Sequence, residues 1–232
     1  MHYRQLSIVI PCLNDERVLA ASLAALQAMR ARGVEVIVVD GGSVDASPRI
    51  AASLADRALT APRGRALQMN AGAAAATGRV VLFLHADCEL PAMADRCIVD
   101  ALAASGREWG RFDVTLTGAH RALAMVAALM NARSRLTGIA TGDQGIFVER
   151  TQFERVGGYP PIPLMEDVAL SRLLKQHGAP LCLRAKIRAS GRRWERDGVL
   201  RTIWLMWRLR FVFFAGGDPA RLAARYYGVP RE

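Results

Sequence analysis

His85 and Asp87 stand two positions apart, directly after the apolar run at residues 80–84. A short unbroken apolar run is typical of a strand that is buried on both faces. Because residues i and i+2 of an extended chain point to the same side, the imidazole and the carboxylate could project together where the strand ends. Mg²⁺ and Mn²⁺ prefer oxygen ligands, and Mn²⁺ also accepts an imidazole. The spacing predicts a divalent-cation site with Asp87 and His85 as ligands; the alternative is a solvated turn with a hydrogen-bonded histidine.

Two further polar clusters follow predicted strands, one at residues 11–16 and one at residues 40–45. In a parallel sheet the carboxyl ends of the strands lie at one edge, where open α/β sheets bind their ligands. Asp40, followed by Gly-Gly-Ser, could bond a ribose or a base edge, although the same four residues also make a good turn. The chain has no Gly-x-Gly-x-x-Gly and no Walker sequence, so a dinucleotide site or a P-loop is poorly supported.

Glu166 and Asp167 come after a proline-rich turn and open a predicted helix. Acidic residues in a first helical turn are ordinary, because they interact favourably with the helix dipole. In a catalytic role, one of these carboxylates could take a proton from an attacking hydroxyl group. Asp143 lies in the turn sequence Thr-Gly-Asp-Gln-Gly and could reach the same pocket.

Basic side chains stand beside an indole at Arg192, Arg193 and Trp194. Two guanidinium groups could clamp a phosphate, and the tryptophan could offer a stacking surface. The alternative is a basic surface turn with an exposed aromatic side chain. Arg63 and Arg65, on either side of Gly64, could also contribute to phosphate binding.

The elements that must position these residues alternate between strands and helices. Strands are predicted at 6–11, 34–39, 80–84, 109–117, 143–149 and 180–189. Helices are predicted from Asn14 as N-cap to Gly33 and at 45–54, 65–76, 91–104, 120–136, 152–156, 165–177 and 198–214. This order predicts an α/β fold with a mostly parallel central sheet flanked by helices and a C-terminal amphipathic helix. We expect one domain over residues 1–232, with a nucleotide-binding half at 1–105 and an acceptor-side half at 106–232.

The net charge of +10 comes from 31 basic and 21 acidic residues and suggests an anionic partner, although no nucleic-acid motif accompanies it. Four cysteines without a C-x-x-C pair, and an N-terminus unlike a signal peptide, predict a reduced, cytoplasmic protein. No apolar run reaches the ~18–20 residues that cross a bilayer. The helix at 199–214 mixes Trp, Phe and Arg, so it could contact the inner face of the membrane peripherally, pack on the core or pair with a second copy.

Several ordered segments resemble family 2 glycosyltransferases with the GT-A fold, and in particular a small bacterial subgroup found beside radical SAM and selenoprotein-related genes. They are SIVIPCLNDE, VIVVDGGSVDAS, APRGRALQMNAGAAAATGRVVLFLHADCEL, TGDQGIFVER, FERVGGYPPIPLMEDVALSRLL and SGRRWERDGVLRT. The resemblance covers almost the whole chain. It implies a nucleotide-sugar donor, a hydroxyl acceptor and a divalent cation, Mn²⁺ or Mg²⁺.

The resemblance also implies residue roles. Asp87 takes the place of the second acid of the D-x-D motif, and His85 replaces the first. Asp167 matches the base of inverting members, with Glu166 beside it. The nucleotide pocket would be lined by Pro11, Glu16, Asp40, which faces the base, and Ser43, with Arg65 near the diphosphate. Arg192, Arg193 and Trp194 resemble the Q-x-x-R-W region of processive relatives but lack its Gln.

Two rival functions remain open. A sugar nucleotidyltransferase usually carries a Gly-rich loop with Arg or Lys directly after the first strand, whereas this chain reads PCLNDE there. A basic binding module for a membrane or a nucleic acid would explain the charge and the last helix without any catalysis.

Overall fold

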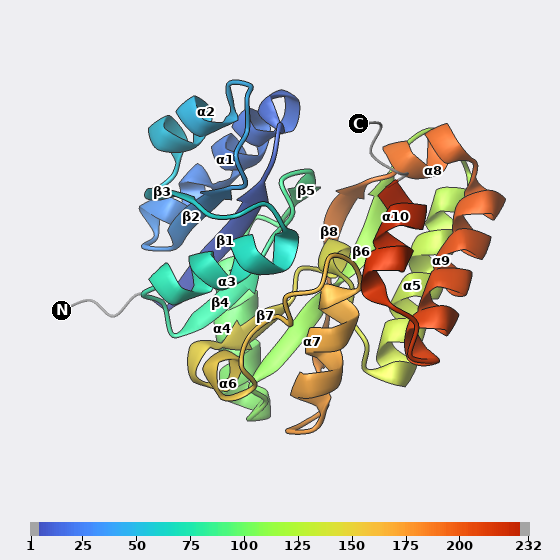
Figure 1. Cartoon of the computed structure of the whole chain (residues 1–232). Helices are drawn as coiled ribbons and strands as arrows, with labels where there is room; N and C mark the ends of the chain where they lie inside the picture. The colour runs from blue at the N-terminus through green and yellow to red at the C-terminus, as the bar shows by residue number, and fades with distance from the viewer. Residues whose placement is uncertain (1–4, 228–232) are drawn as a thin grey trace.

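The computed structural model describes residues 5–227, and a mixed sheet runs through its centre (Figure 1). Within these residues the sheet has eight strands in the order β3-β2-β1-β4-β7-β6-β8-β5. The strands are β1 Leu6–Cys12, β2 Glu35–Asp40, β3 Arg57–Thr60, β4 Val80–Phe83, β5 Cys88–Glu89, β6 Trp109–Thr117, β7 Phe147–Glu149 and β8 Leu181–Ser190. β7 and β5 run antiparallel to their neighbours, and the other pairs are parallel. The predicted α/β fold with a mostly parallel sheet is confirmed.

Helices cover both faces of the sheet. They are α1 Glu16–Ala31, α2 Ser47–Leu54, α3 Arg65–Ala75, α4 Ala94–Ser105, α5 Ala122–Thr137, α6 Arg150–Arg155, α7 Glu166–Lys175, α8 Arg192–Asp197, α9 Val199–Phe214 and α10 Pro219–Tyr227. Figure 1 shows α1 and α3 on opposite faces of the first strands, and α5, α8, α9 and α10 gathered at the other end of the molecule. A short 3₁₀ turn, η1, spans Gly142–Gln144.

Two apolar layers follow from the alternation of side chains along the strands. On β1, Ile8 and Ile10 join the layer under α1, whereas Val9 joins the layer under α3. α1 buries Leu19, Leu23, Leu26 and Met29, which recur at helical spacing. α3 comes very close to the sheet at Gly72, where a β-carbon would overlap Val9 and Val39. These layers fix the strand ends from which the polar residues project.

The structure departs from the predicted elements in a few places. β3 is a four-residue edge strand of mostly exposed residues. The sequence did not predict it because it contains no apolar run. Residues 142–144 form η1 rather than the start of a strand, and only Phe147–Glu149 is extended. Asn14 does not cap α1: its φ is +55°, and its Oδ1 accepts the Val44 N–H. β5, α8 and α10 are further elements that the sequence pattern did not predict.

Two observations bear on the chain's surroundings. Cys12, Cys88, Cys97 and Cys182 are all free. Within residues 5–227, no helix combines the length and the apolarity needed to traverse a bilayer.

Candidate active site

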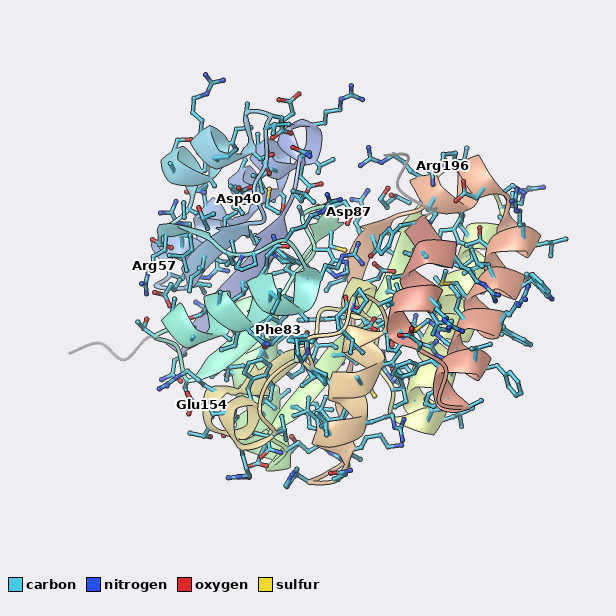
Figure 2. The ribbon with its side chains drawn as sticks, viewed as in Figure 1. Asp40, Arg57, Phe83, Asp87, Glu154 and Arg196 are labelled. Carbon is cyan, nitrogen blue, oxygen red and sulfur yellow. The ribbon has the colours of Figure 1, made fainter. Side chains whose placement is uncertain are left out.

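A cavity of about 1130 Å³ lies between the sheet edge and the C-terminal helices. Its walls come from α3, the end of β4, α5, η1, the start of α7, α8, α9 and α10. The predicted site residues that line it are Arg65, His85, Asp87, Asp143, Glu166, Asp167, Arg192, Arg193 and Trp194. Figure 2 shows Asp87 at the centre of the molecule, between the first strands and the C-terminal helices. One cavity therefore collects carboxylates, an imidazole and guanidinium groups from both halves of the chain.

The two adjacent carboxyl groups at the start of α7 are held differently. Asp167 Oδ2 accepts the Gly142 N–H at 2.9 Å, and its Oδ1 accepts the Val168 N–H at 2.7 Å. Glu166 is only 6 % exposed. Burial, and then the neighbouring charge of Asp167, raise the pKa of Glu166. Met165, just before this pair, has a φ of +68°, a conformation that is strained for a side chain of its size.

The turn η1 joins the carboxylate pair to the histidine. Its Gly142 bonds Asp167, while Asp143 Oδ1 lies 3.4 Å from His85 Nδ1. Burial acts to raise the pKa of Asp143, but the hydrogen bond and charge of His85, with the charges of two arginines, outweigh it, so that pKa lies below its usual range. The turn is fixed from beneath by Gln144, which is fully buried and bonded to Thr141. It thus sets the positions of two carboxylates at once.

A group of possible metal ligands surrounds His85. Ligand atoms of His85, Cys88 and Asp143 all lie within 4.8 Å of one another. Cys88 Sγ is 3.9 Å from Asp87 Oδ1, so Asp87 lies beside the group while its own side chain reaches the cavity. Burial, with the charges of Asp143 and Asp87, raises the pKa of the Cys88 thiol well above its usual value. The imidazole of His85 and the carboxylate oxygens of Asp87 and Asp143 are donors that suit Mn²⁺ or Mg²⁺.

The basic residues of α8 form some of their contacts with other residues of the protein. The Arg193 guanidinium lies 3.7 Å from the Tyr226 ring centroid and donates to the Tyr226 carbonyl, which ties α8 to α10. Arg192 Nε donates to Ser190 Oγ at 3.0 Å. Burial lowers the pKa of Arg65, but Tyr227, Glu166 and Asp143 more than offset this, so that pKa is raised. Arg65 therefore faces the carboxylates from the opposite wall.

Pro11, Glu16, Asp40 and Ser43 lie outside the lining of this cavity. The Asp40 carboxylate accepts the N–H groups of Gly42 and Ser43, both at 2.9 Å, and the Ser43 hydroxyl. The loop after β1 is joined to this turn, because Glu16 Oε2 accepts the Ala46 N–H at 3.0 Å. Pro11 pairs with Val39 inside the sheet. These residues form a second polar group at the strand ends, and Figure 2 shows one of them, Asp40, to the left of Asp87.

Sequence reasoning missed several lining residues, among them Arg133 on α5, Arg210 and Trp207 on α9, and Tyr226 and Tyr227 on α10. The sequence could have indicated Arg210, since this residue interrupts an otherwise apolar helix face. It could not have indicated Arg133, because basic residues on a helix are usually solvated. Their place in the site depends on how α5 and α9 pack, which the local sequence does not state.

Known proteins of similar sequence are glycosyltransferases of unassigned role. An uncharacterized glycosyltransferase of Mycobacterium bovis is 37% identical over 87 residues, which is 37% of this chain and 38% of that protein. The chain thus spans less than two thirds of the length of such relatives.

Solved structures extend the likeness over most of the chain. Staphylococcus aureus TarS in complex with UDP-GlcNAc has a TM-score of 0.66 at 15% identity, covering 80% of this chain and 58% of that one. The mannosyltransferase PcManGT of Pyrobaculum calidifontis, in complex with GDP-Man and Mn²⁺, has a TM-score of 0.61 at 22% identity, covering 90% and 61%. These likenesses show the fold, which is the predicted GT-A fold. The sequence model described as "Glycosyl transferase family 2" matches residues 7–122, half of the chain, and the chain therefore belongs to that family.

Proposed function

We propose that this protein transfers a sugar from a nucleotide-sugar donor to a hydroxyl group of an acceptor, with inversion at the anomeric carbon and with help from a divalent cation. The observation that carries the proposal is the position of Asp167. Its carboxylate is oriented by Gly142 and opens into the same cavity as His85, Asp87 and Asp143. A general base and a cation-binding group thus lie within one cavity, which is what a direct displacement needs.

Asp167 acts as the base that takes the proton from the acceptor hydroxyl. Two backbone N–H groups hold its carboxylate, which limits its rotation and leaves lone pairs for the hydroxyl. Burial, and then the charge of Asp167, raise the pKa of the neighbouring Glu166. Arg65 contributes positive charge near the donor diphosphate.

Asp87 and His85 are the proposed ligands of Mn²⁺ or Mg²⁺, and Asp143 orients the imidazole. The close group of possible ligands is His85, Cys88 and Asp143, and Asp87 lies beside it, next to Cys88. A divalent cation bound there would neutralise charge on the departing nucleoside diphosphate. Support comes from PcManGT, whose structure was solved with GDP-Man and Mn²⁺.

The division of labour follows the predicted halves. Residues 1–105 bind the nucleotide, through Pro11, Glu16, Asp40 and Ser43, and residues 106–232 face the acceptor. The exposed face of α9 makes peripheral contact with the inner face of the membrane, or pairs with a second copy in a homodimer. The resemblance to the subgroup found beside radical SAM and selenoprotein-related genes remains a prediction.

The test is donor hydrolysis or transfer with Mn²⁺ in the Asp167→Asn and Asp87→Ala variants. Removing a general base costs about 10²–10⁴-fold in rate, so we expect kcat to fall by that factor for Asp167→Asn. Glu154→Gln is the matched control, since it removes an exposed carboxylate of α6 that pairs with Arg150 and lies outside the cavity lining. Wild-type rates in both site variants would refute the assignment.

Donor identity is accessible by thermal shift with UDP, GDP and dTDP, each with and without Mn²⁺. A ligand that binds only the folded state raises its apparent stability, by about 2.7 kcal/mol at a concentration one hundred times Kd. We expect one nucleotide to raise Tm more than the others, and more with Mn²⁺ than without. A flat response to all three would favour the binding-module function instead.

A further inference from the structure

Two arginines of the cavity have no protein partner. Arg133 Nε and Nη2 and Arg210 Nε are buried without a hydrogen-bond acceptor. Within residues 5–227, neither guanidinium group donates a hydrogen bond to the protein or lies within salt-bridge distance of a carboxylate. Buried polar atoms without a hydrogen-bond acceptor are costly, so two such groups in one cavity need an explanation. Arg133 and Arg210 are half-buried, whereas Arg111 is fully buried and pairs with Asp113.

Both arginines come from the C-terminal half of the chain, the half that the proposed function assigns to the acceptor. Arg133 belongs to α5 and Arg210 to α9, whereas Arg65 reaches the cavity from α3 in the other half. Burial lowers the pKa of Arg133 to about 10, with Arg210 adding to the effect and Asp167 opposing it. Burial likewise lowers the pKa of Arg210, with Asp167 and Asp143 opposing it. The charge of the Asp167 carboxylate thus acts on both guanidinium groups, and that of Arg210 also acts on Arg133.

The cavity wall around these arginines is apolar and open to solvent. Leu129 and Leu136 of α5 and Trp207 of α9 line it, with 56%, 86% and 70% of their surface exposed. The stripe continues along α9 at helical spacing, through the exposed side chains Leu200, Trp204, Trp207, Phe211 and Phe214. An exposed apolar surface of this extent marks a binding region, and a nucleotide sugar is too polar to cover it.

We propose that Arg133 and Arg210 bind an anionic group of the acceptor, a phosphate or a carboxylate, and that the apolar remainder of that acceptor lies along α5 and α9. The acceptor is then an anionic amphiphile. This inference rests on the proposed glycosyl transfer, because it assigns an acceptor class to the same cavity. The planar guanidinium group can form two parallel hydrogen bonds to a phosphate or to a carboxylate. Two such groups therefore bind an anionic acceptor more tightly than a neutral one.

Calorimetric titration of octyl phosphate, inorganic phosphate and 1-octanol separates the contributions of the anionic group and of the chain. We expect octyl phosphate to bind more tightly than either of the other two. Inorganic phosphate binding as tightly as octyl phosphate would show an anion site without an apolar part and would overturn the amphiphile. Equal binding of 1-octanol would overturn the role of the arginines.

Arg133→Gln and Arg210→Gln are each expected to weaken octyl phosphate binding about tenfold to a hundredfold, the range for a charge-assisted hydrogen bond. Arg201→Gln is the matched control on α9, since it removes the same charge from an exposed residue outside the cavity lining. Its Kd should stay within about twofold of wild type, because an exposed charge outside the site contributes little. Unchanged binding in both cavity variants would overturn the proposal.

Trp207→Ala and Trp204→Ala test the apolar wall. Both tryptophans are exposed on α9, but only Trp207 lines the cavity. Trp207→Ala should weaken octyl phosphate binding about fivefold or more, and Trp204→Ala should have little effect. If the protein instead forms a dimer that Trp204→Ala dissociates, and octyl phosphate does not bind, the apolar face belongs to a second copy and the proposal is wrong.

A measurement of nucleoside diphosphate binding distinguishes a failure of the acceptor proposal from a failure of the proposed function. In Arg133→Gln and Arg210→Gln, the thermal shift produced by nucleoside diphosphate with Mn²⁺ should equal that of wild type, which also shows that the variants fold. If nucleoside diphosphate raises the Tm of the wild type but not that of these variants, the arginines belong to the donor site and the acceptor assignment is wrong. If no nucleoside diphosphate stabilises the wild type, the proposed function fails, while the octyl phosphate titration still decides the anion site.

Discussion

At the scale of single residues, Glu166 and Asp167 show how neighbours in the chain acquire different properties. Asp167 is held by the N–H groups of Gly142 and Val168, which fix the orientation of its carboxylate. Glu166 is buried, and burial together with the charge of Asp167 raises its pKa. We propose Asp167 as the base because its oriented carboxylate lines the cavity.

Glu166→Gln is predicted to stabilise the protein at neutral pH. A carboxyl group whose pKa is raised by folding stabilises the folded state fully below its usual pKa of 4.5, and this contribution is lost as pH rises through the raised value. The neutral amide pays no such penalty. Thermal unfolding should therefore give a Tm above that of wild type at about pH 7.5, with the gain vanishing at about pH 4.5.

Glu154→Gln serves as the control for this pH dependence, because Glu154 is exposed and forms only a surface ion pair with Arg150. Exposed pairs contribute about 0–1 kcal/mol, so its Tm should follow wild type closely at both pH values. A Tm gain for Glu166→Gln that is equal at both pH values would contradict the assigned cause.

At the scale of elements, the turn η1 connects the proposed cation ligand His85 to the proposed base Asp167. Its three residues place Gly142 under Asp167 and Asp143 beside His85. Gly142 has no positive φ, so glycine is not required there by the backbone. It is required by space, since a β-carbon at Gly142 would overlap the His85 ring.

Gly142→Ala is predicted to displace the His85 ring and to weaken Mn²⁺ binding about 10- to 100-fold, the range seen when groups that orient metal ligands are lost. Titration of Mn²⁺ by thermal shift measures the change. In a His85→Ala background the same substitution should have almost no further effect, because the overlapping ring is gone. Additive effects of the two substitutions would mean that Gly142 acts through some other contact.

The elements that the sequence predicts well are those whose evidence is local. Buried parallel strands appear as unbroken apolar runs, as at residues 80–84, and α1 appears through its apolar spacing. β3 could not be found this way, because it is an exposed edge strand whose pairing with β2 supplies its order. Asn14 looked like a helix cap, but a non-local bond to Val44 draws it into a left-handed conformation.

The candidate site follows the same division. Residues at strand ends, such as His85, Asp87 and Asp40, could be named in advance because sheet topology places them. Asp40 nevertheless accepts hydrogen bonds within its own turn, which agrees with the alternative interpretation of Asp-Gly-Gly-Ser as a turn sequence. Arg133 and Arg210 could not be named, since they enter the cavity only through the packing of α5 and α9.

At the scale of the whole molecule, the apolar interior is divided unevenly. Two large layers fill the sheet faces, and a third cluster of five buried side chains stands apart from them. It joins Leu164, Met165 and Val168, on either side of the carboxylate pair, to Leu209 of α9 and Leu222 of α10. The strained Met165 backbone is therefore held in place by side chains from the two last helices.

Because this cluster is small, we predict that local unfolding around it, rather than melting of the sheet, ends activity on heating. Leu222→Ala should lower the temperature at which activity is lost while the unfolding of the sheet, followed by far-ultraviolet circular dichroism, changes little. Leu102→Ala is the matched control, because Leu102 is equally buried but belongs to the large layer under α4. It should lower the Tm of the sheet by about 5 °C or more. We therefore expect a few contacts of α9 and α10 to limit the working temperature of the protein, below the temperature at which its sheet unfolds.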